Sequence, residues 1–321
     1  MTTIGAGRPF RRQAFLAATA AFAAAPLLAR AQGLVKIRVG ATVQDDIVGV
    51  LWASQSGIYQ KYGLDVDVIR SNNGVAISAA VLSGSLEIGK GGALSTYIAH
   101  AKGVPILVEA PSAIYVSTAA NVALVVAKTS RLQRGRDFNG KTVAVPALGD
   151  LFTLGISAWI DKNGGDAKSV KFLELPGAAQ ADAIAAGRVD AAALAEPLVT
   201  DAIRSGKCRF VAHPYDAIAP RFAATLMFAS SDYAAKNVDV LARFRKGTAE
   251  GLTYALAHRS EMIPLLAKFT GIDPSVLAST SQTTIGTTLD PRLIQPVIDV
   301  AVKYGVLAKS FPAKDVIDPN A

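Results

Sequence analysis

The segment that decides the fold is GIYQKYGLDVDVIR, residues 57–70. Its first half continues a run with apolar residues at helical spacing, and Gly63 ends that run. Its second half alternates apolar and acidic residues, which is typical of a half-buried strand. The segment therefore predicts a helix over residues 47–62 that leads directly into a strand over residues 64–70.

The same alternation of short strands and longer helices extends in both directions along the chain. A β-branched run at residues 35–41 predicts a strand before the first helix, and a second, similar series begins after residue 121. Alternation of this kind favours mostly parallel sheets with helices on their faces. Because 321 residues exceed the usual length of one domain, we expect an α/β fold with two lobes.

The lobes are not expected to be consecutive in the chain. The Pro-bearing stretch at residues 213–220 is typical of a return crossing, and the pattern becomes helical beyond residue 228. We therefore expect lobe 1 to comprise residues 32–120 and 221–321, and lobe 2 to comprise residues 121–220. The alternative is two sequential domains joined by a simple linker.

The first 31 residues form a separate, basic segment. They contain four arginines and no acidic residue, so without them the net charge falls from +8 to +4. A basic start, an apolar run over residues 13–28 and the small-x-small sequence Ala29-Arg30-Ala31 are typical of a signal peptide that is cleaved after Ala31. The mature protein is then expected in the periplasm. An uncleaved N-terminal anchor is the alternative.

The export route stays open, because RRQAFL at residues 11–16 resembles a twin-arginine signal with one residue too many. No later segment is apolar enough to span a bilayer, so we expect no stable membrane insertion. The remaining charge is spread along the chain without a basic run or an aromatic-interleaved patch, which argues against binding of nucleic acid.

Several kinds of chemistry are absent from the sequence. Cys208 is the only cysteine, so neither an intrachain disulfide nor a cysteine-based metal site is expected. His100, His213 and His258 are far apart and form no metal-binding motif. There is no P-loop and no G-x-S-x-G motif. We therefore predict no metal, no cofactor and no catalytic residues.

Five short motifs carry a resemblance to a known family. They are, in chain order, GIYQKYGLDV (57–66), AVLSGSLEIG (80–89), FNGKTVAV (138–145), AAGRVDA (185–191) and Glu196-Pro197. Together they resemble the substrate-binding proteins of ABC importers for nitrate, sulfonates, taurine and thiamine-pyrimidine precursors. The resemblance implies the type II periplasmic binding protein fold, with a ligand cleft between the lobes. It also implies a monomer that closes over a small molecule and a permease as partner.

Candidate ligand-binding residues lie after the predicted strands, because loops at the carboxyl ends of parallel strands border the crevice of an open α/β sheet. Side-chain amides and carboxylates offer hydrogen bonds there, and paired glycines let a ligand approach the backbone. The Glu196 position also resembles one at which the family has a carboxylate. The candidates are Thr42, Gln44, Asp45, Asn72, Asn73, Gly91, Gly92, Ala93, Gly149, Asp150, Phe152 and Glu196. For Asp45, Glu196 and the two asparagines, the alternative is a purely local role in capping a helix or forming a turn.

The predicted ligand is a small polar organic molecule that is sulfonate-, heteroaromatic- or carboxylate-like. A simple anion is not favoured, because the carboxylates of Asp45, Asp46 and Glu196 outnumber Arg70 and Lys90, the cations at strand ends. The predicted function is capture of this ligand for an ABC importer, without catalysis. One alternative is a ligand-sensing module for a membrane receptor. Another is a pyrimidine-precursor enzyme of the same fold, although those enzymes carry a Cys-rich motif that this chain lacks.

Overall fold

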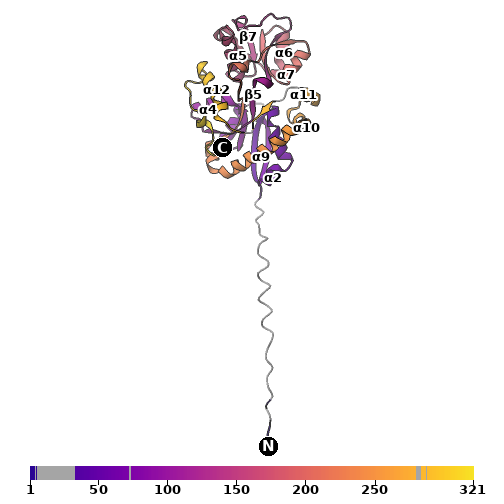
Figure 1. Ribbon diagram of the computed structural model, residues 1–321, viewed down its shortest axis with the longest axis vertical. Coiled ribbons are helices and arrows are strands. Elements are labelled where there is room, and N and C mark those ends of the chain that lie inside the picture. The colour runs from indigo at the N-terminus through magenta and orange to yellow at the C-terminus, as the bar shows by residue number, and fades with distance from the viewer. Residues whose placement is uncertain (4, 6–32, 72–73, 280–282, 287) are drawn as a thin grey trace. The chain divides into compact units, whose positions relative to one another are not determined.

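A computed structural model describes residues 1–3, 5, 33–71, 74–279, 283–286 and 288–321. The chain divides into two compact units, Met1–Gly33 and Leu34–Ala321. Every helix and strand described below belongs to the second unit (Figure 1). Most of the predicted signal peptide, residues 1–31, lies outside the described residues.

The first sheet has five strands in the order β2-β1-β3-β12-β4. They are β1 (Val35–Thr42), β2 (Leu64–Ser71), β3 (Ile88–Gly92), β4 (Ile106–Pro111) and β12 (Thr225–Ser230). β1 pairs in parallel with β2 and β3, whereas β12 is antiparallel to β3 and β4. Within this sheet only β12 is reversed, so the carboxyl ends of the other four strands lie at one edge.

Helices from distant parts of the chain surround the first sheet. They are α1 (Val48–Gln55), α2 (Ile58–Lys61), α3 (Gly74–Leu82), α4 (Ala93–Ala101), α8 (Ser231–Lys236) and α9 (Val238–Ala257). α1 and α9 approach closely because glycines face the contact. A Cβ added to Gly49 would lie 2.8 Å from Leu252 Cα.

The predicted helix over residues 47–62 is wrong in its continuity. A 3₁₀ turn at Asp45–Ile47 precedes α1, and α1 and α2 are separate helices. Gly57, between them, has a φ of 82° in the left-handed region. The interruption follows from this glycine, since a right-handed helix cannot continue through that conformation.

The second sheet also has five strands, in the order β10-β6-β9-β7-β8. They are β6 (Val122–Ala127), β7 (Thr142–Val145), β8 (Lys171–Glu174), β9 (Ala191–Ala195) and β10 (Cys208–Ala212). Its helices are α5 (Leu151–Lys162), α6 (Gly177–Ala185) and α7 (Leu198–Arg204). β7 is parallel to β8 and β9, while β6 is antiparallel to both of its neighbours, β9 and β10. This sheet, too, has one reversed strand, so both sheets are mostly parallel, as predicted.

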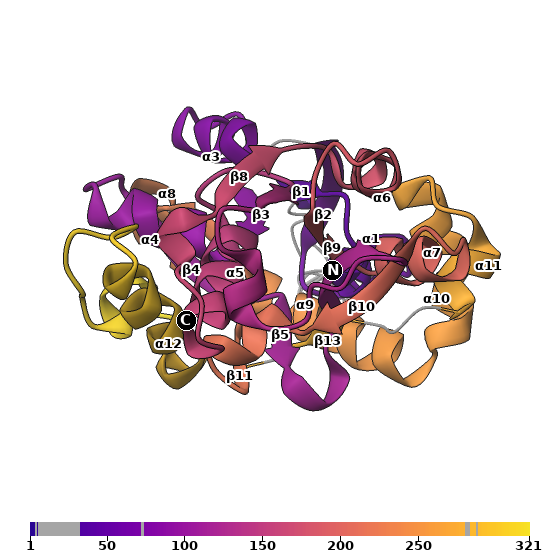
Figure 2. The ribbon, with the colours of Figure 1, turned by 90° about the horizontal axis from the view of Figure 1, so that it is seen from above.

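Two short strands connect the sheets. β5 (Ala113–Val116) leads out of the first sheet and β11 (Arg221–Ala223) leads back to it. They pair antiparallel, and β13 (Thr284–Ile285) adds on the other side of β5 (Figure 2). Short 3₁₀ turns occur at Ser117–Ala119, Gly135–Phe138, Ala167–Ser169, Pro214–Ala217 and Ala313–Val316.

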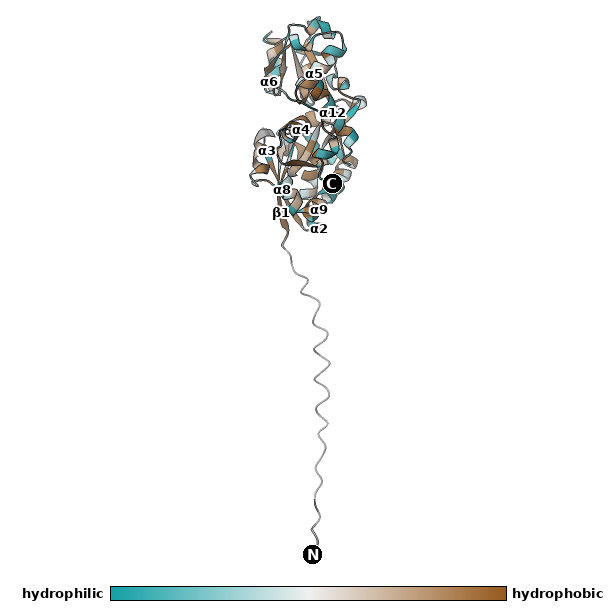
Figure 3. Ribbon diagram, turned by 90° about the vertical axis from the view of Figure 1, so that its left-hand side faces the viewer, coloured by the Kyte–Doolittle hydropathy of each residue, from teal (hydrophilic) through white to brown (hydrophobic). Residues whose placement is uncertain are grey.

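The last third of the chain contains α10 (Arg259–Thr270), α11 (Pro274–Ser279) and α12 (Pro291–Lys303). Figure 3 shows hydrophobic and hydrophilic residues mixed along α12. Its buried residues, such as Ile294 and Val297, belong to one apolar cluster with Leu226 of the first sheet and Val122 of the second. α12 therefore contributes to a core that both sheets share. In the described part of the chain, no helix has the length and apolar character needed to cross a membrane.

Candidate functional site

A buried ion pair with β3 of the first sheet fixes the loop after β1. Lys90 in β3 is fully buried, and its Nζ pairs with a carboxylate oxygen of Asp46. Asp46 also accepts a hydrogen bond from Ser112 Oγ at 2.9 Å and another from Thr225 Oγ1. The charge of Lys90 is therefore compensated inside the protein, as a buried charge requires.

The ammonium of Lys90 also holds two of the candidate ligand residues. Its Nζ donates to Gln44 Oε1 at 2.7 Å and to Thr42 Oγ1 at 3.2 Å. Thr42 Oγ1 in turn donates to Gln44 Oε1 at 3.0 Å. The side chain of Gln44 is exposed although its oxygen is held. This loop is thus ordered by contacts with the sheet beneath it.

Asp45 links this loop to Thr283, the residue directly before β13. Its carboxylate accepts from Thr283 Oγ1 at 2.6 Å and from Thr283 N at 3.1 Å. Burial, followed by the neighbouring Asp46 carboxylate, raises the pKa of Asp45, against the effect of the Thr283 hydrogen bonds. Both oxygens of Asp45 already have a donor, which agrees with a local structural role beside any role toward a ligand.

The hydrogen bonds continue from Thr283 to the second sheet. Asn121 Nδ2 donates to Thr283 Oγ1 at 3.0 Å, and Asn121 O accepts from Glu196 N at 2.8 Å. Asp45 follows the carboxyl end of β1, and Glu196 follows that of β9. The candidates of the two sheets are therefore joined through Thr283 and Asn121. We name these four residues the bridging network.

Glu196 caps α7. Its carboxylate accepts from Thr200 N at 3.1 Å and from Thr200 Oγ1 at 3.0 Å, and the peptide bond to Pro197 is cis. A carboxylate at this position complements the partial positive charge of the helix N-terminus. Glu196 is partly exposed, so a role as cap leaves part of its surface open.

Asp150 caps α5 in the same way, at the end of the loop after β7. Its Oδ1 accepts from Thr153 N at 3.0 Å. Burial raises the pKa of Asp150 to about 6, against the effect of the hydrogen bonds from Thr153. Gly149 has a φ of 70°, and Phe152 lies in α5 with its ring 5.8 Å from that of Tyr215.

The predicted glycine loop after β3 is a strand in the structure. Gly91 and Gly92 belong to β3 and pair with β12, and Gly91 is buried. The loop interpretation was wrong because β12, from much later in the chain, extends β3 to Gly92. Ala93 is buried and its N–H donates to Ala224 O at 3.0 Å, so of these three residues only Gly92 is exposed. Asn72 and Asn73 lie outside the described residues.

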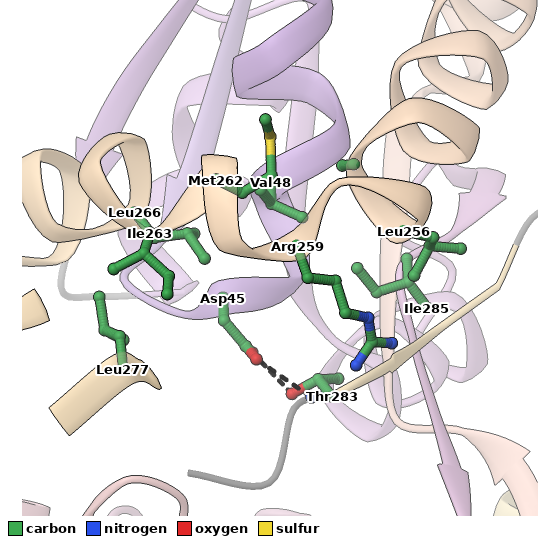
Figure 4. Close-up of a pocket in the computed structure, with 11 residues that line it drawn as sticks. Asp45, Val48, Leu256, Arg259, Met262, Ile263, Leu266, Leu277, Thr283 and Ile285 are labelled. Carbon is green, nitrogen blue, oxygen red and sulfur yellow. Dashed lines mark hydrogen bonds between the residues drawn. The ribbon is translucent and has the colours of Figure 1, made fainter. Parts of the chain in front are cut away.

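A small pocket of about 40 Å³ lies beside Asp45 (Figure 4). α1, α10 and α11 supply apolar walls, including Val48, Leu266 and Leu277. Arg259 extends from α10 toward Thr283 in this pocket, is exposed, and has no ion-pair partner among the described residues. Asp45 thus belongs both to the bridging network and to this pocket.

Sequence reasoning did not find Arg259, Thr283 or Asn121. Arg259 and Thr283 lie more than 200 residues after Asp45, and no motif surrounds them. Asn121 was seen only as the boundary before a strand. In the described part of the chain, no group of three or more His, Cys, Asp or Glu residues could hold a metal ion. Cys208 is buried.

Comparison with known proteins gives matches to one family model and to solved structures. A family model described as NMT1/THI5 like matches residues 44–262. The aliphatic sulphonate binding protein SsuA from Escherichia coli superimposes with a TM-score of 0.73 at 21% identity, covering 88% of this chain and 91% of that one. No curated protein gives a significant match.

Two further solved structures share the fold. The nitrate-binding protein NrtA from Synechocystis PCC 6803 gives a TM-score of 0.74 at 13% identity, covering 89% of this chain and 86% of its own. The alkanesulfonate-binding protein SsuA from Xanthomonas axonopodis pv. citri, bound to MOPS, gives 0.71 at 20% identity, covering 88% and 98%. At such identities the likeness establishes the periplasmic binding protein fold.

Proposed function

Because this chain belongs to the NMT1/THI5-like family and has the fold of periplasmic binding proteins, we propose that it captures a small polar organic molecule and delivers it to an ABC importer. Lobe 1 would comprise residues 32–120 and 221–321, and lobe 2 residues 121–220. The ligand would bind between them, and closure of the lobes would be a hinge motion. β5 and β11, which connect the two sheets, would be the hinge strands.

The observation that carries this proposal is the bridging network. It joins Asp45, at the carboxyl edge of the first sheet, to Glu196, at the carboxyl edge of the second, through Thr283 and Asn121. Ligands of open α/β sheets bind outside these edges. A network that couples both edges suits a site whose two halves must respond to one molecule.

The proposed ligand has a polar group and an apolar or heteroaromatic body. The apolar walls of the pocket beside Asp45 favour such a body, although its volume of about 40 Å³ suits one substituent rather than a whole molecule. Arg259 adds a cation beside Asp45, whereas the ammonium of Lys90 is already paired with Asp46. Sulfonates, carboxylates and heteroaromatic compounds therefore remain the classes to screen.

We propose no enzymatic activity. The pyrimidine-precursor enzymes of this fold carry a Cys-rich motif, whereas Cys208 is the only cysteine here and is buried. Export to the periplasm, with cleavage after Ala31, belongs to the same proposal. N-terminal sequencing of the mature protein, expected to begin at Gln32, checks that part.

The function is tested by native mass spectrometry and small-angle scattering of the purified protein. We expect a co-purified or added small molecule to bind with one-to-one stoichiometry and to reduce the radius of gyration. Thr283→Val removes the side-chain hydrogen bonds to Asp45 and Asn121 and should weaken binding by about tenfold. Thr253→Val is the matched control, because Thr253 is an exposed residue of α9 whose Oγ1 donates to Ala249 O in the same helix. Absence of compaction with every compound that binds would contradict the proposal.

A further inference from the structure

Gln44 and Lys90 define a donor position in the proposed ligand site. An ammonium group has three N–H donors and no acceptor. The ammonium group of Lys90 pairs with the carboxylate of Asp46 and donates to Thr42 Oγ1 at 3.2 Å and to Gln44 Oε1 at 2.7 Å. All three acceptors come from the short stretch at the end of β1, so one buried side chain fixes the whole loop.

This contact determines which way the carboxamide of Gln44 points. Its NH₂ group cannot face Lys90, because two donors would then oppose each other. The oxygen must face inward, where Thr42 Oγ1 also donates to it at 3.0 Å. The backbone supports the same placement, since Gln44 N donates to Thr42 O at 2.9 Å.

The NH₂ group of Gln44 is therefore directed away from the sheet. Gln44 is exposed, and its Nε2 makes no hydrogen bond within the described parts of the chain. The neighbouring Asp45 differs, because both of its oxygens accept hydrogen bonds from Thr283. The group of this loop that remains available to a ligand is therefore the NH₂ donor of Gln44, although the loop contains the acidic residues Asp45 and Asp46.

We infer that Gln44 is a specificity-determining donor that requires a hydrogen-bond acceptor on the ligand, and that Lys90 is the positioning residue which imposes this polarity. The inference rests on the proposed binding function. The acceptor is an oxygen of a carboxylate, sulfonate or carbonyl group, or a ring nitrogen. A ligand that presents only an ammonium group at this point is rejected, because it places a donor against a donor.

The buried network explains why the donor is fixed. If Lys90 had only Gln44 as a partner, its own buried charge would be uncompensated. Asp46 provides the compensation, and Ser112 and Thr225 hold Asp46 in turn. The orientation of Gln44 is thus held by side chains of β3 and β12 and by Ser112, which a ligand need not touch.

Gln44→Glu is the decisive variant. It keeps an oxygen for Lys90 and Thr42 but replaces the outward NH₂ group with a second oxygen. Gln44→Met removes the donor without adding charge. Gln55→Glu is the matched control, since Gln55 is an exposed residue at the end of α1. Probes are butanesulfonate, benzoate, a neutral aminopyrimidine and, as the acceptor-free probe, butylammonium.

We expect each probe that binds the wild type to lose at least about tenfold in affinity in both Gln44 variants and to keep its affinity in Gln55→Glu. Thermal unfolding of Gln44→Glu should be unchanged or shifted upward, because the new carboxylate faces Lys90. Butylammonium binding as tightly as the acids, or unchanged affinity in Gln44→Glu, would overturn the role of Gln44. No binding of any compound to the wild type would instead overturn the proposed function together with this inference.

The positioning role of Lys90 has its own test, which needs no ligand. In ¹H–¹⁵N spectra, we expect a slowly exchanging ammonium signal from Lys90, since the group is fully buried. That signal should shift in Gln44→Met and stay in place in Gln55→Glu. No shift in Gln44→Met would contradict the contact. The double variant Lys90→Met/Asp46→Asn removes both buried charges together and frees the carboxamide of Gln44 to rotate. The ratio of the affinity for the acids to the affinity for butylammonium should then become smaller. An unchanged ratio would overturn the positioning role.

Discussion

Glu196 combines a structural role that the structure shows with a proposed role in binding. As a cap of α7 it accepts two hydrogen bonds from Thr200. Through its backbone N–H it joins the bridging network at Asn121. The two roles make different predictions, because capping affects only stability, whereas ligand contact also affects affinity.

Replacing Glu196 by alanine should change both quantities. Loss of the cap should lower the free energy of unfolding by about 1 kcal/mol. If the carboxylate also meets the ligand, the affinity should fall by roughly 1 to 3 kcal/mol, measured by isothermal titration calorimetry.

Ser230→Ala is the matched control for this variant. Ser230 caps α8 by accepting from Tyr233 N at 3.2 Å, and it lies at the end of the reversed strand β12, on the edge opposite to the proposed site. It should lose a similar amount of stability with unchanged affinity. Equal ligand affinities of Glu196→Ala and the wild type would mean that Glu196 only caps α7 and does not contact the ligand.

Glu109 is a buried acid that the proposed site does not use. It lies in β4, and its Oε2 is 2.7 Å from Arg245 Nη1, which is also 3.7 Å from Asp318 Oδ2. Burial, followed by the nearby Asp318 carboxylate, raises the pKa of Glu109 to about 7, against the effect of Arg245. One guanidinium thus serves two buried carboxylates, and Glu109 holds a proton in the folded protein under mildly acidic conditions.

The stability of the protein should therefore depend on pH through Glu109. A pKa that is higher in the folded state means that the folded protein binds the extra proton. The contribution is present at low pH and is lost as the pH rises through about 7. The free energy of unfolding of the wild type is compared with that of Glu109→Gln at each pH. We expect the wild-type value minus the variant value to fall by on the order of 1 to 3 kcal/mol between about pH 5 and pH 8. A flat difference in urea denaturation across this range would contradict the assigned proton.

At the scale of elements, the break between α1 and α2 depends on one glycine. Gly57 has a φ of 82°, which is unfavourable for residues with a Cβ, so Gly57→Ala should cost about 1 to 2 kcal/mol. Gly74→Ala is the control, because Gly74 begins α3 and an added Cβ would meet nothing within 4 Å. Thermal unfolding should show a lower midpoint for the first variant and an equal or higher one for the second. Equal midpoints in Gly57→Ala and the wild type would mean that the break tolerates a side chain.

Much of the element order could be predicted from the sequence. β1 and β2 have local signals, a β-branched run and an alternation of apolar and acidic residues, and they form where those signals predict. β10 was not predicted, because Cys208–Ala212 has little β-branched character. Its strand conformation depends on pairing with β6, a partner about 80 residues away.

The candidate site could be predicted only in part. The loop after β1 and the start of α7 were identifiable, since each follows a strand. The partners of these loops were not, because Lys90, Thr283 and Arg259 reach the site by tertiary folding across 44 residues or more. Lys90 was expected to be a cation available to the ligand, whereas burial beside Asp46 makes it an internal partner.

At the scale of the whole molecule, the shared core predicts how the described body unfolds. One apolar cluster includes Val122 and Leu154 from the second sheet and its helix, together with Leu226 and Ile298. Tyr304 directly follows α12, and its hydroxyl donates to Asp161 Oδ2 of α5 at 3.0 Å. Neither sheet can lose its structure without exposing apolar surface of the other.

We therefore expect residues 33–321 to unfold in one cooperative transition. In differential scanning calorimetry the calorimetric and van't Hoff enthalpies should agree. Two resolved transitions would show that the shared cluster contributes little to coupling.

The two reversed strands, β6 and β12, have a further consequence. β6 follows the connecting strand β5, and β12 follows the connecting strand β11. The first sheet is therefore built from residues that come before the second sheet in the chain and from residues that come after it. A protease that cuts one crossing would leave two interleaved fragments rather than two separable halves. Conversely, the second sheet is a continuous insertion, residues 122–212, which gives protein engineers a defined module to exchange between relatives while the chain termini and the first sheet stay intact.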